Sequence, residues 1–213
     1  MMSFLLDFFF PRRSLLGEEG EWITDTERSL LKASPVVLEG SALKDLGIRS
    51  LDRIVAAARY GSSPLLKKAI HTFKYKRIPG LYEDLGRMIT HVAPAIDRGD
   101  VPVLCPIPLH WTRKFQRGFN QSELLAEVVA RERGYPVRSL LRRTRPTGHQ
   151  AWRNRVERKS ALKDAFVASA ADVPAFVILI DDLSTTGATL EECAKALRNV
   201  GVKRIEGWVV AQG

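Results

Sequence analysis

The sequence predicts an α/β fold in which a mainly parallel sheet is flanked by helices. Short apolar stretches alternate along the chain with amphipathic segments, the pattern of strand–helix–strand units. The run Val177-Ile178-Leu179-Ile180 is apolar throughout, as expected for a strand that is covered on both faces. With 213 residues, 45% of them hydrophobic, the chain can bury one full domain and a small appendage.

The elements are predicted in order from residue 51 onward. A strand over 51–59 precedes a helix over 65–75, which Gly61-Ser62-Ser63-Pro64 caps. Further helices are expected over 81–96, 122–133 and 190–200, and further strands over 101–106, from 161–167 into the apolar run, and over 204–211. In sheets of this kind ligands bind beyond the carboxyl ends of the strands.

The most informative segment follows the apolar run. Asp181 and Asp182 are adjacent acids at the expected strand end, and a loop rich in hydroxyls leads on to the helix: Ser184, Thr185, Thr186, Gly187, Ala188 and Thr189. A loop that enters a helix N-terminus binds anions through backbone N–H groups and the helix dipole. The acids suit a sugar diol or a magnesium ion beside the phosphate. The segment therefore predicts a ribose 5-phosphate site.

Two other phosphate motifs are excluded, because the segment has neither the Gly-Lys-Ser/Thr of a Walker loop nor the spaced glycines of a dinucleotide fold. A buried strand that ends in a polar turn would explain the apolar run. It would not explain two neighbouring acids followed by four hydroxyl residues and a glycine.

The net charge of +9 is unevenly distributed. Residues 1–50 carry slightly more acids than bases, so the positive excess lies in residues 51–213. Bases are densest over 138–159, where Glu157 is the single acid among them. A nucleic-acid surface and a solvated basic face are both compatible with this stretch.

The cysteines and the N-terminus indicate a cytoplasmic protein. Cys105 and Cys193 lie among apolar neighbours and are expected to be reduced core thiols. The apolar start is interrupted by Asp7, ends at Pro11 and has no evident cleavage site, which favours a docking helix over a signal sequence. No segment approaches the length of a membrane span.

The strand–Asp-Asp–Thr-Thr-Gly-x-Thr segment resembles the 5-phosphoribosyl 1-diphosphate (PRPP) motif of type I phosphoribosyltransferases. A second stretch narrows the resemblance: Pro106, Pro108, Leu109 and His110, followed by Arg117-Gly118-Phe119-Asn120-Gln121. Together these residues resemble the ComF family, which includes ComFC-type and GntX-type proteins. The likeness covers about residue 51 to the C-terminus and implies a phosphoribosyltransferase-like domain over 51–213.

The resemblance also implies roles for particular residues. Asp181 and Asp182 would be the catalytic acids that hold the ribose hydroxyls, with Mg²⁺ brought by PRPP, and 184–189 would bind the 5′-phosphate. Contacts to the diphosphate would come from Ile107, Leu109, His110, Arg113, Lys114 and Arg117, and more weakly from Lys74 and Lys76, for which a surface role is equally open. His110 and Asn120 can alternatively cap the helices that follow them. A nucleic-acid surface would include Arg142, Arg143, Arg145, Trp152, Arg153 and Arg155.

Members of this family usually carry an N-terminal zinc domain with Cys-x-x-Cys pairs. This chain has Ser14-Leu15-Leu16-Gly17 at the first pair and no cysteine before Cys105, so thiolate-bound zinc is not expected. Residues 1–50 would form a hood over the cleft, held by packing. Two functions are open: PRPP binding by a factor that handles single-stranded DNA with competence or recombination proteins, or phosphoribosyl transfer to an unknown acceptor.

Overall fold

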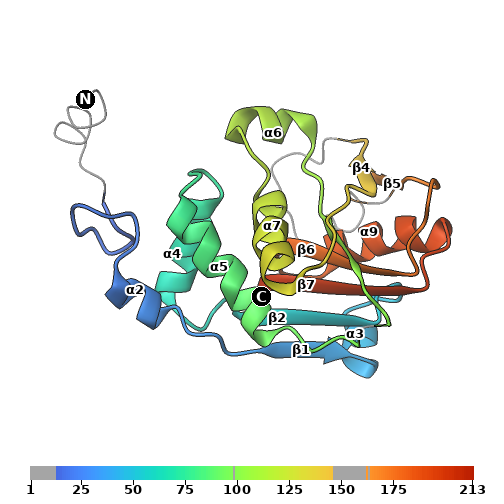
Figure 1. Ribbon diagram of the computed structural model, residues 1–213, viewed down its shortest axis with the longest axis horizontal. Helices are drawn as coiled ribbons and strands as arrows, with labels where there is room; N and C mark the ends of the chain where they lie inside the picture. Colours follow the sequence, from blue (N-terminus) through green and yellow to red (C-terminus); the bar gives the residue numbers. More distant parts are fainter. Residues whose placement is uncertain (1–12, 98, 146–161, 163) are drawn as a thin grey trace.

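The computed structural model describes residues 13–97, 99–145, 162 and 164–213, and its centre is a five-stranded sheet (Figure 1). The strand order is β1-β2-β7-β6-β3. The strands are β1 (Val36–Glu39), β2 (Arg53–Arg59), β3 (Val103–Pro106), β6 (Phe176–Ser184) and β7 (Arg204–Gln212). Four of them are parallel, and β1 adds an antiparallel edge. The predicted α/β class with a mainly parallel sheet is confirmed.

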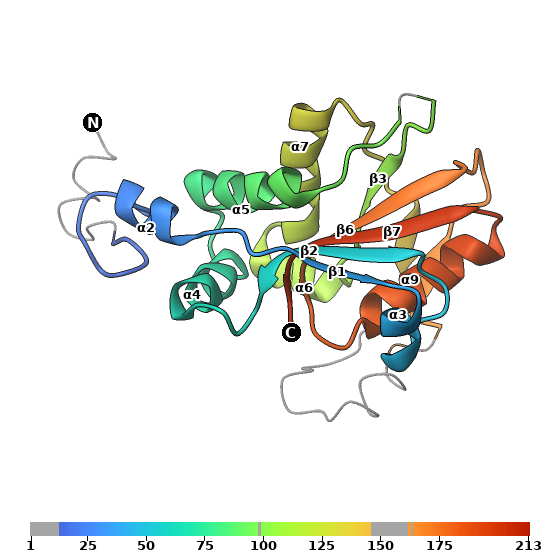
Figure 2. The same ribbon diagram turned by 90° about the horizontal axis from the view of Figure 1, so that it is seen from below.

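Helices cover both faces of this sheet (Figure 2). On one face lie α4 (Pro64–Phe73), α5 (Pro79–Val92) and α7 (Gln121–Arg133), and on the other lie α3 (Ser41–Asp45) and α9 (Ala188–Asn199). Side chains alternate between the two cores along each strand, so that Ile178 and Ile180 join the first while Val177 and Leu179 join the second. All four are fully buried, as the apolar run predicts.

Local signals place the helix starts well. Ser63 is the N-cap of α4, where its hydroxyl accepts a hydrogen bond from the Leu66 amide, and Pro64 occupies the first turn. Helix α5 ends earlier than predicted, at Val92, because Ala93 adopts an extended conformation ahead of Pro94. The Asp pair lies inside β6 rather than at its end, since pairing continues to Ser184 opposite Gln212.

One predicted connection is wrong. Residues 161–167 were expected to lead into β6, but β5 (Phe166–Ala168) pairs antiparallel with β4 (Leu141–Arg143) in a separate small sheet. Leu141 and Phe166 turn inward from this sheet and join the core beside α9. The chain between the two strands lies largely outside the described residues. No local sequence pattern predicts that these two strands pair.

The described part of the N-terminal region contains α2 (Asp25–Leu30) and a loop that is held by Glu27. The buried carboxylate of Glu27 accepts hydrogen bonds from the Leu16 amide and from the Thr24 amide at 2.8 Å, within a capping box. Burial opposes ionisation of Glu27, but these hydrogen bonds and one to Ser14 keep its pKa below its usual value. A carboxylate thus organises the loop at residues 14–17.

Residues 36–50 are continuous with the main domain. Strand β1 belongs to the central sheet, and Leu43 and Ile48 lie in the core beside α9. Across the described ranges, no helix combines the length and the hydropathy needed to cross a membrane.

Candidate functional site

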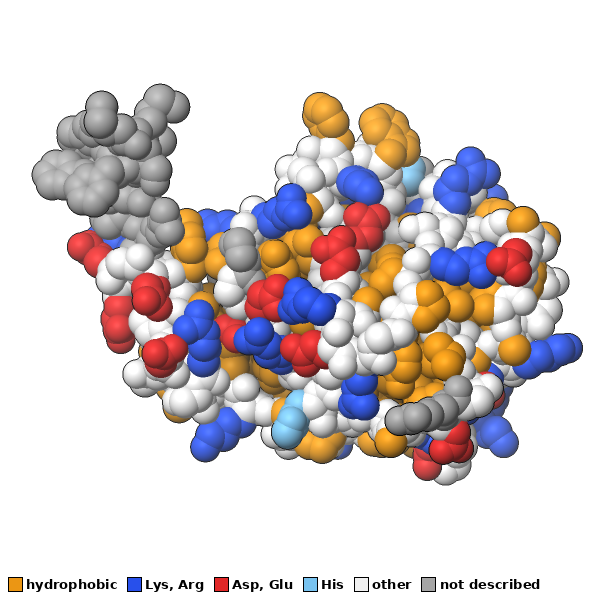
Figure 3. All heavy atoms as spheres, viewed as in Figure 1, with side chains coloured by type: hydrophobic (Ala, Val, Ile, Leu, Met, Phe, Trp, Pro, Cys, Tyr) orange, Lys and Arg blue, Asp and Glu red, His pale blue; other side chains and the backbone are white. Residues whose placement is uncertain are grey.

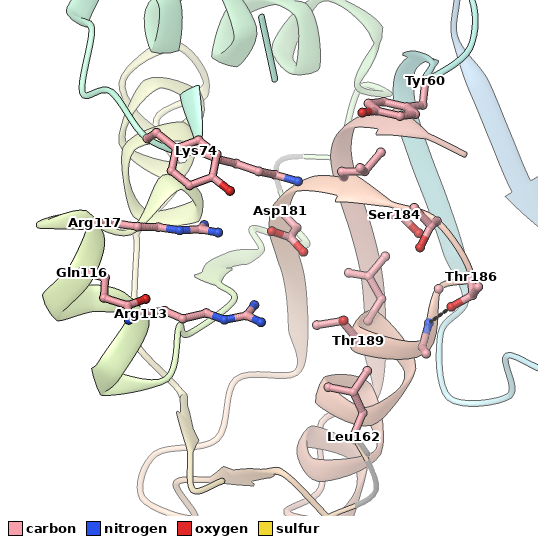
Figure 4. Close-up of a pocket in the computed structure, with 16 residues that line it drawn as sticks. Tyr60, Lys74, Arg113, Gln116, Arg117, Leu162, Asp181, Ser184, Thr186 and Thr189 are labelled. Atoms are coloured by element: carbon pink, nitrogen blue, oxygen red, sulfur yellow. Dashed lines mark hydrogen bonds between the residues drawn. The ribbon is translucent and has the colours of Figure 1, made fainter. Parts of the chain in front are cut away.

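A pocket of about 510 Å³ opens beyond the carboxyl end of β6 (Figure 4). Its lining residues are Tyr60, Lys74, Tyr75, Arg113, Gln116, Arg117, Leu162, Asp181 and residues 183–190. Hydroxyl groups, backbone and one acid lie on the β6–α9 side, while lysine and arginine side chains reach in from the opposite side. This division suits a ligand that carries anionic groups at both ends.

All six residues predicted to bind the 5′-phosphate, Ser184 through Thr189, line the pocket. Gly187 is the N-cap of α9 with φ 71°, a left-handed conformation that favours glycine. The Thr186 hydroxyl accepts a hydrogen bond from the Ala188 amide at 3.4 Å. The buried Ser184 hydroxyl has no hydrogen-bond partner among the described residues. A donor of this kind beside a helix N-terminus is suited to an anion.

The end of β7 holds the loop from one side. The Gln212 amide group donates to the Thr185 carbonyl at 3.1 Å, and the Gly213 amide donates to the Ser184 carbonyl at 2.9 Å. The backbone bond continues the pairing of β6 and β7 past its last paired residues, and the Gln212 side chain adds a second link to the loop.

The N-terminal segment holds the loop from the other side, which sequence reasoning missed. Ile48 packs against Gly187 so closely that a Cβ there would overlap its side chain. The buried Glu191 carboxylate of α9 accepts hydrogen bonds from the amides of Arg49, at 3.0 Å, and Ser50, at 2.9 Å, and from the Ser50 hydroxyl at 3.0 Å. Residues 48–50 therefore support the phosphate loop.

The two acids differ in environment because neighbouring strand residues point to opposite sides. Asp181 lines the pocket and accepts hydrogen bonds from the Ser122 hydroxyl at 3.0 Å and from the Asp182 amide at 2.9 Å. Asp182 lies 3.6 Å from the Lys74 ammonium, and within the described ranges its Oδ2 accepts no hydrogen bond. Burial, and then the charge of Asp182, raise the pKa of Asp181 to about 7.

The cationic wall combines the end of α4 with α6 (Trp111–Arg117). Lys74, Arg113 and Arg117 extend toward Asp181 and the loop (Figure 4). The Arg117 guanidinium lies 5.7 Å from the Tyr75 ring centre, a cation–π distance. Burial, and then the charge of Arg117, lower the pKa of Arg113. The predicted positions of Arg113 and Arg117 are therefore at the pocket.

The predicted diphosphate loop needs one correction. Ile107 donates its amide hydrogen to the Ile180 carbonyl at 3.1 Å, so this amide extends the sheet and is not available to a ligand. His110 is buried and accepts a hydrogen bond from the Thr112 amide at 3.4 Å as the N-cap of α6, which is the capping alternative. Leu109 and His110 do not line the pocket in the described part of the chain, and their diphosphate role stays a prediction.

The predicted nucleic-acid residues divide into three groups. Arg142 and Arg145 are exposed on and just after β4. Arg143 turns the other way, with its guanidinium 5.3 Å from the Phe166 ring centre, and burial, together with the charge of Arg113, lowers its pKa. The remaining three, Trp152, Arg153 and Arg155, lie outside the described residues.

Sequence reasoning missed two exposed aromatic side chains beside the pocket. Trp111 is 72% exposed and Phe115 is 86% exposed, one turn apart on α6, whose other side supplies Arg113 and Arg117. Figure 3 shows hydrophobic side chains projecting from the top of the molecule, where Figure 1 places α6. Their spacing of four residues within a basic segment was the available signal.

Both cysteines are buried and neither forms a disulfide, in line with the expectation of core thiols. Burial raises the pKa of the Cys105 thiol to about 11 and that of Cys193 well above its usual value. Both are therefore uncharged and apolar in character at neutral pH.

The structure is that of an α/β protein with a pocket lined by hydroxyl groups and cationic side chains at the carboxyl end of its parallel strands. Comparison with known proteins identifies several relatives of this chain. The chain is 35% identical over 113 residues to Competence protein F of Haemophilus influenzae, covering 51% of this chain and 49% of that protein. It is 29% identical over 165 residues to DNA utilization protein YhgH of Escherichia coli K12, covering 75% and 72%. A third match, Competence protein ComFC of Streptococcus pneumoniae, is 35% identical over 100 residues and covers 47% and 43%.

The chain is a homologue of the ComF and YhgH proteins, which confirms the family resemblance. It spans about half the length of the two competence proteins. No protein-family model matches it.

Two solved structures are similar to this chain. They are glutamine PRPP amidotransferase from B. subtilis, with TM-score 0.44 and 18% identity, and the allosteric regulatory enzyme of purine biosynthesis, with TM-score 0.41 and 17% identity. Each match covers 66% of this chain and 30% of the other.

Proposed function

We propose that this chain binds PRPP with Mg²⁺ and acts in the cytoplasm in the handling of single-stranded DNA. One observation carries the proposal: a hydroxyl-rich loop at a helix N-terminus and an acid face a wall of three cations across one pocket. PRPP is a sugar with a phosphate at one end and a diphosphate at the other. Its phosphate would face the loop, its ribose hydroxyls the acid, and its diphosphate the cations. The names of the relatives, competence and DNA utilization proteins, support the DNA-related role.

The 5′-phosphate would lie against residues 184–189. The first amides of α9 have no acceptor within the helix, and the Ser184 hydroxyl lacks a partner within the described residues. A phosphate accepts hydrogen bonds from both, and the positive end of the helix dipole favours its charge.

The ribose would lie over Asp181, whose carboxylate can accept hydrogen bonds from a diol. The diphosphate would extend toward Lys74, Arg113 and Arg117. Mg²⁺ prefers carboxylate and phosphate oxygens and binds proteins through few ligands plus substrate phosphates. Asp181 provides such oxygens at the pocket, so it is compatible with Mg²⁺ that arrives with the diphosphate.

The alternative function is phosphoribosyl transfer to a small or macromolecular acceptor. In that reaction the bond from ribose C1 to diphosphate breaks, positive charge develops on the ring, and the leaving group departs with its electron pair. A nucleophilic atom of the acceptor supplies the electron pair of the new bond to C1. The three cations would stabilise the diphosphate, and Asp181 would stabilise the ring. Magnesium would supply further charge neutralisation on the leaving group.

The DNA surface is proposed to include the exposed Arg142 and Arg145 together with the α6 aromatics. Arginines contact phosphates without reading sequence, while aromatic rings stack on unpaired bases. Trp111 and Phe115 stand on the same helix as pocket arginines, so a bound single strand would pass the pocket mouth. Competence or recombination proteins that bind the same strand are the expected partners.

Calorimetry with PRPP and Mg²⁺ tests the ligand. Asp181→Ala plus Asp182→Ala should abolish binding, whereas Asp45→Ala plus Asp97→Ala, which removes two exposed acids of equal charge, should leave it unchanged. Unchanged affinity in the first double variant would refute the proposed site.

Two further measurements separate the alternatives. Magnesium-dependent release of diphosphate from PRPP, lost in the same variant, favours transfer. Salt-dependent binding of oligonucleotides, weakened by Arg142→Ala plus Arg145→Ala, favours the DNA-handling role. Elemental analysis of the purified protein is expected to find no stoichiometric zinc, and zinc at one equivalent would contradict the interpretation of the N-terminal region.

A further inference from the structure

Three consecutive polar side chains at the start of α7 are buried and form hydrogen bonds with three separate segments around the pocket. Asn120, Gln121 and Ser122 are each 2% exposed. Each donates one hydrogen bond to a group distant in the chain, and none of the three lines the pocket in the described part of the chain. Buried donors of this kind cost free energy unless they are paired, so these pairings fix geometry.

The three hydrogen bonds have distinct destinations. The Asn120 amide group donates to the Ile107 carbonyl at 3.1 Å, where the loop after β3 begins. The Gln121 amide group donates to the Lys74 carbonyl at 2.9 Å, at the C-cap of α4. The Ser122 hydroxyl donates to the Asp181 carboxylate at 3.0 Å.

The start of α7 can lie beside β6 because β3 is short. Its pairing with β6 ends at Pro106 opposite Ile180, so beyond that point this edge of β6 has no neighbouring strand. The start of α7 takes the vacant position and brings Ser122 to Asp181. The hydrogen-bonded partners are 13, 47 and 59 residues apart in the sequence, so only the tertiary fold brings them together.

The helix that carries the turn is itself firmly placed. Leu125 and Val128 are fully buried, and α5 approaches so closely that a Cβ at Gly86 would overlap Val128. Lys114 of α6 forms an ion pair with Glu123 at 3.1 Å, which links α6 to the first turn of α7. Displacing the start of α7 would therefore move several walls of the pocket.

We propose that Asn120–Ser122 is the positioning element of the pocket, setting the distance between the ribose acid and the diphosphate-binding side without contacting the ligand. This inference rests on the proposed PRPP site. Each hydrogen bond serves one part of the ligand: Ser122 orients the acid beneath the ribose, and Asn120 orients the loop that leads into α6, the helix of Arg113 and Arg117. Gln121 orients the backbone that carries the Lys74 ammonium.

The roles of Asn120 and Ser122 can be measured separately with fragments of PRPP. Calorimetry compares PRPP, ribose 5-phosphate and inorganic diphosphate on the full chain with Mg²⁺. Ser122→Ala should weaken PRPP and ribose 5-phosphate binding about tenfold, the size of one hydrogen bond to a charged group, and leave diphosphate binding unchanged. Asn120→Asp keeps the acceptor for the Ser122 amide but loses the donor, and it should weaken PRPP and diphosphate while sparing ribose 5-phosphate.

Controls distinguish positioning from general stability. Ser122→Thr retains the hydroxyl and should restore the ligand profile of the wild type, which also covers the case in which Ser122→Ala does not fold. Thr90→Val removes another buried hydroxyl, bonded to the Gly86 carbonyl at 3.0 Å on α5, and should change no ligand affinity.

Equal losses for all three ligands in both variants, or no loss in either, would overturn the positioning role while leaving the PRPP site standing. A wild-type protein that binds none of the three ligands would instead refute the proposed function, and this inference with it.

Discussion

Gly187→Ala should destabilise the phosphate loop for two separable reasons. First, residue 187 has φ 71°, and a side chain in this left-handed conformation costs about 1–2 kcal/mol. Second, the new methyl group would overlap Ile48 Cδ1 and lie 3.2 Å from its Cγ1, and overpacking of this kind costs about 1–3 kcal/mol. The free energy of unfolding should fall by about 2–5 kcal/mol in total.

Gly134→Ala is the matched control. Gly134 caps α7 with φ 72°, but nothing lies within 4 Å of a Cβ built there. This variant should lose only the conformational part, about 1–2 kcal/mol. The change in unfolded-chain entropy is the same for both substitutions and cancels in the comparison.

Urea denaturation followed by tryptophan fluorescence measures both variants, and calorimetry measures phosphate affinity. Combining Gly187→Ala with Ile48→Ala removes the overlap, so the two losses should sum to more than the loss in the double variant. Equal destabilisation of the Gly187 and Gly134 variants, with phosphate binding retained in both, would refute the close support of the loop by Ile48.

Three further predictions concern other parts of the site. Glu191→Gln should lower the free energy of unfolding by about 1–3 kcal/mol, because the amides at 49–50 lose a charged acceptor. Asp181 has a pKa of about 7, above its unfolded value, so the wild type loses stability as pH rises from about 4 to 7. Asp181→Asn should therefore melt at a higher temperature than the wild type above pH 7, with the difference vanishing near pH 4. Trp111→Ala plus Phe115→Ala should weaken oligothymidylate binding at least tenfold without changing the melting temperature, because both side chains are exposed.

Each of these predictions has a control. Glu192→Gln alters a neighbouring acid that pairs with the exposed Lys195 and accepts one hydrogen bond from the Asp164 amide at 3.3 Å, and it should lower stability less than Glu191→Gln. For the pH effect, a constant difference in melting temperature from pH 4 to 8 would show that Asp181 does not titrate in this range. Leu30→Ala plus Val37→Ala removes two exposed apolar side chains elsewhere and should leave DNA binding intact.

Local chemistry predicted the elements and the phosphate loop. A continuous apolar run, Ser63 before Pro64, and hydroxyls around Gly187 each act through neighbours a few residues away, so their consequences can be read from short segments. The same locality explains the placement of Arg113 and Arg117, which follow the proline-rich loop on a single helix.

Contacts between residues far apart in the sequence determine the other features of the site. Ile107 lost its expected ligand role because β6 lies beside it, and Glu191 gained a structural role because Arg49 and Ser50 return to the helix start from 141–142 residues away. The residue types at 120–122 permit capping of α7, and their pairing with Ile107, Lys74 and Asp181 depends on where β3 stops. The sequence by itself determined which groups could bind a phosphorylated sugar. Only the tertiary structure decided which donors remain available, because a hydrogen bond made within the fold removes that donor from the ligand.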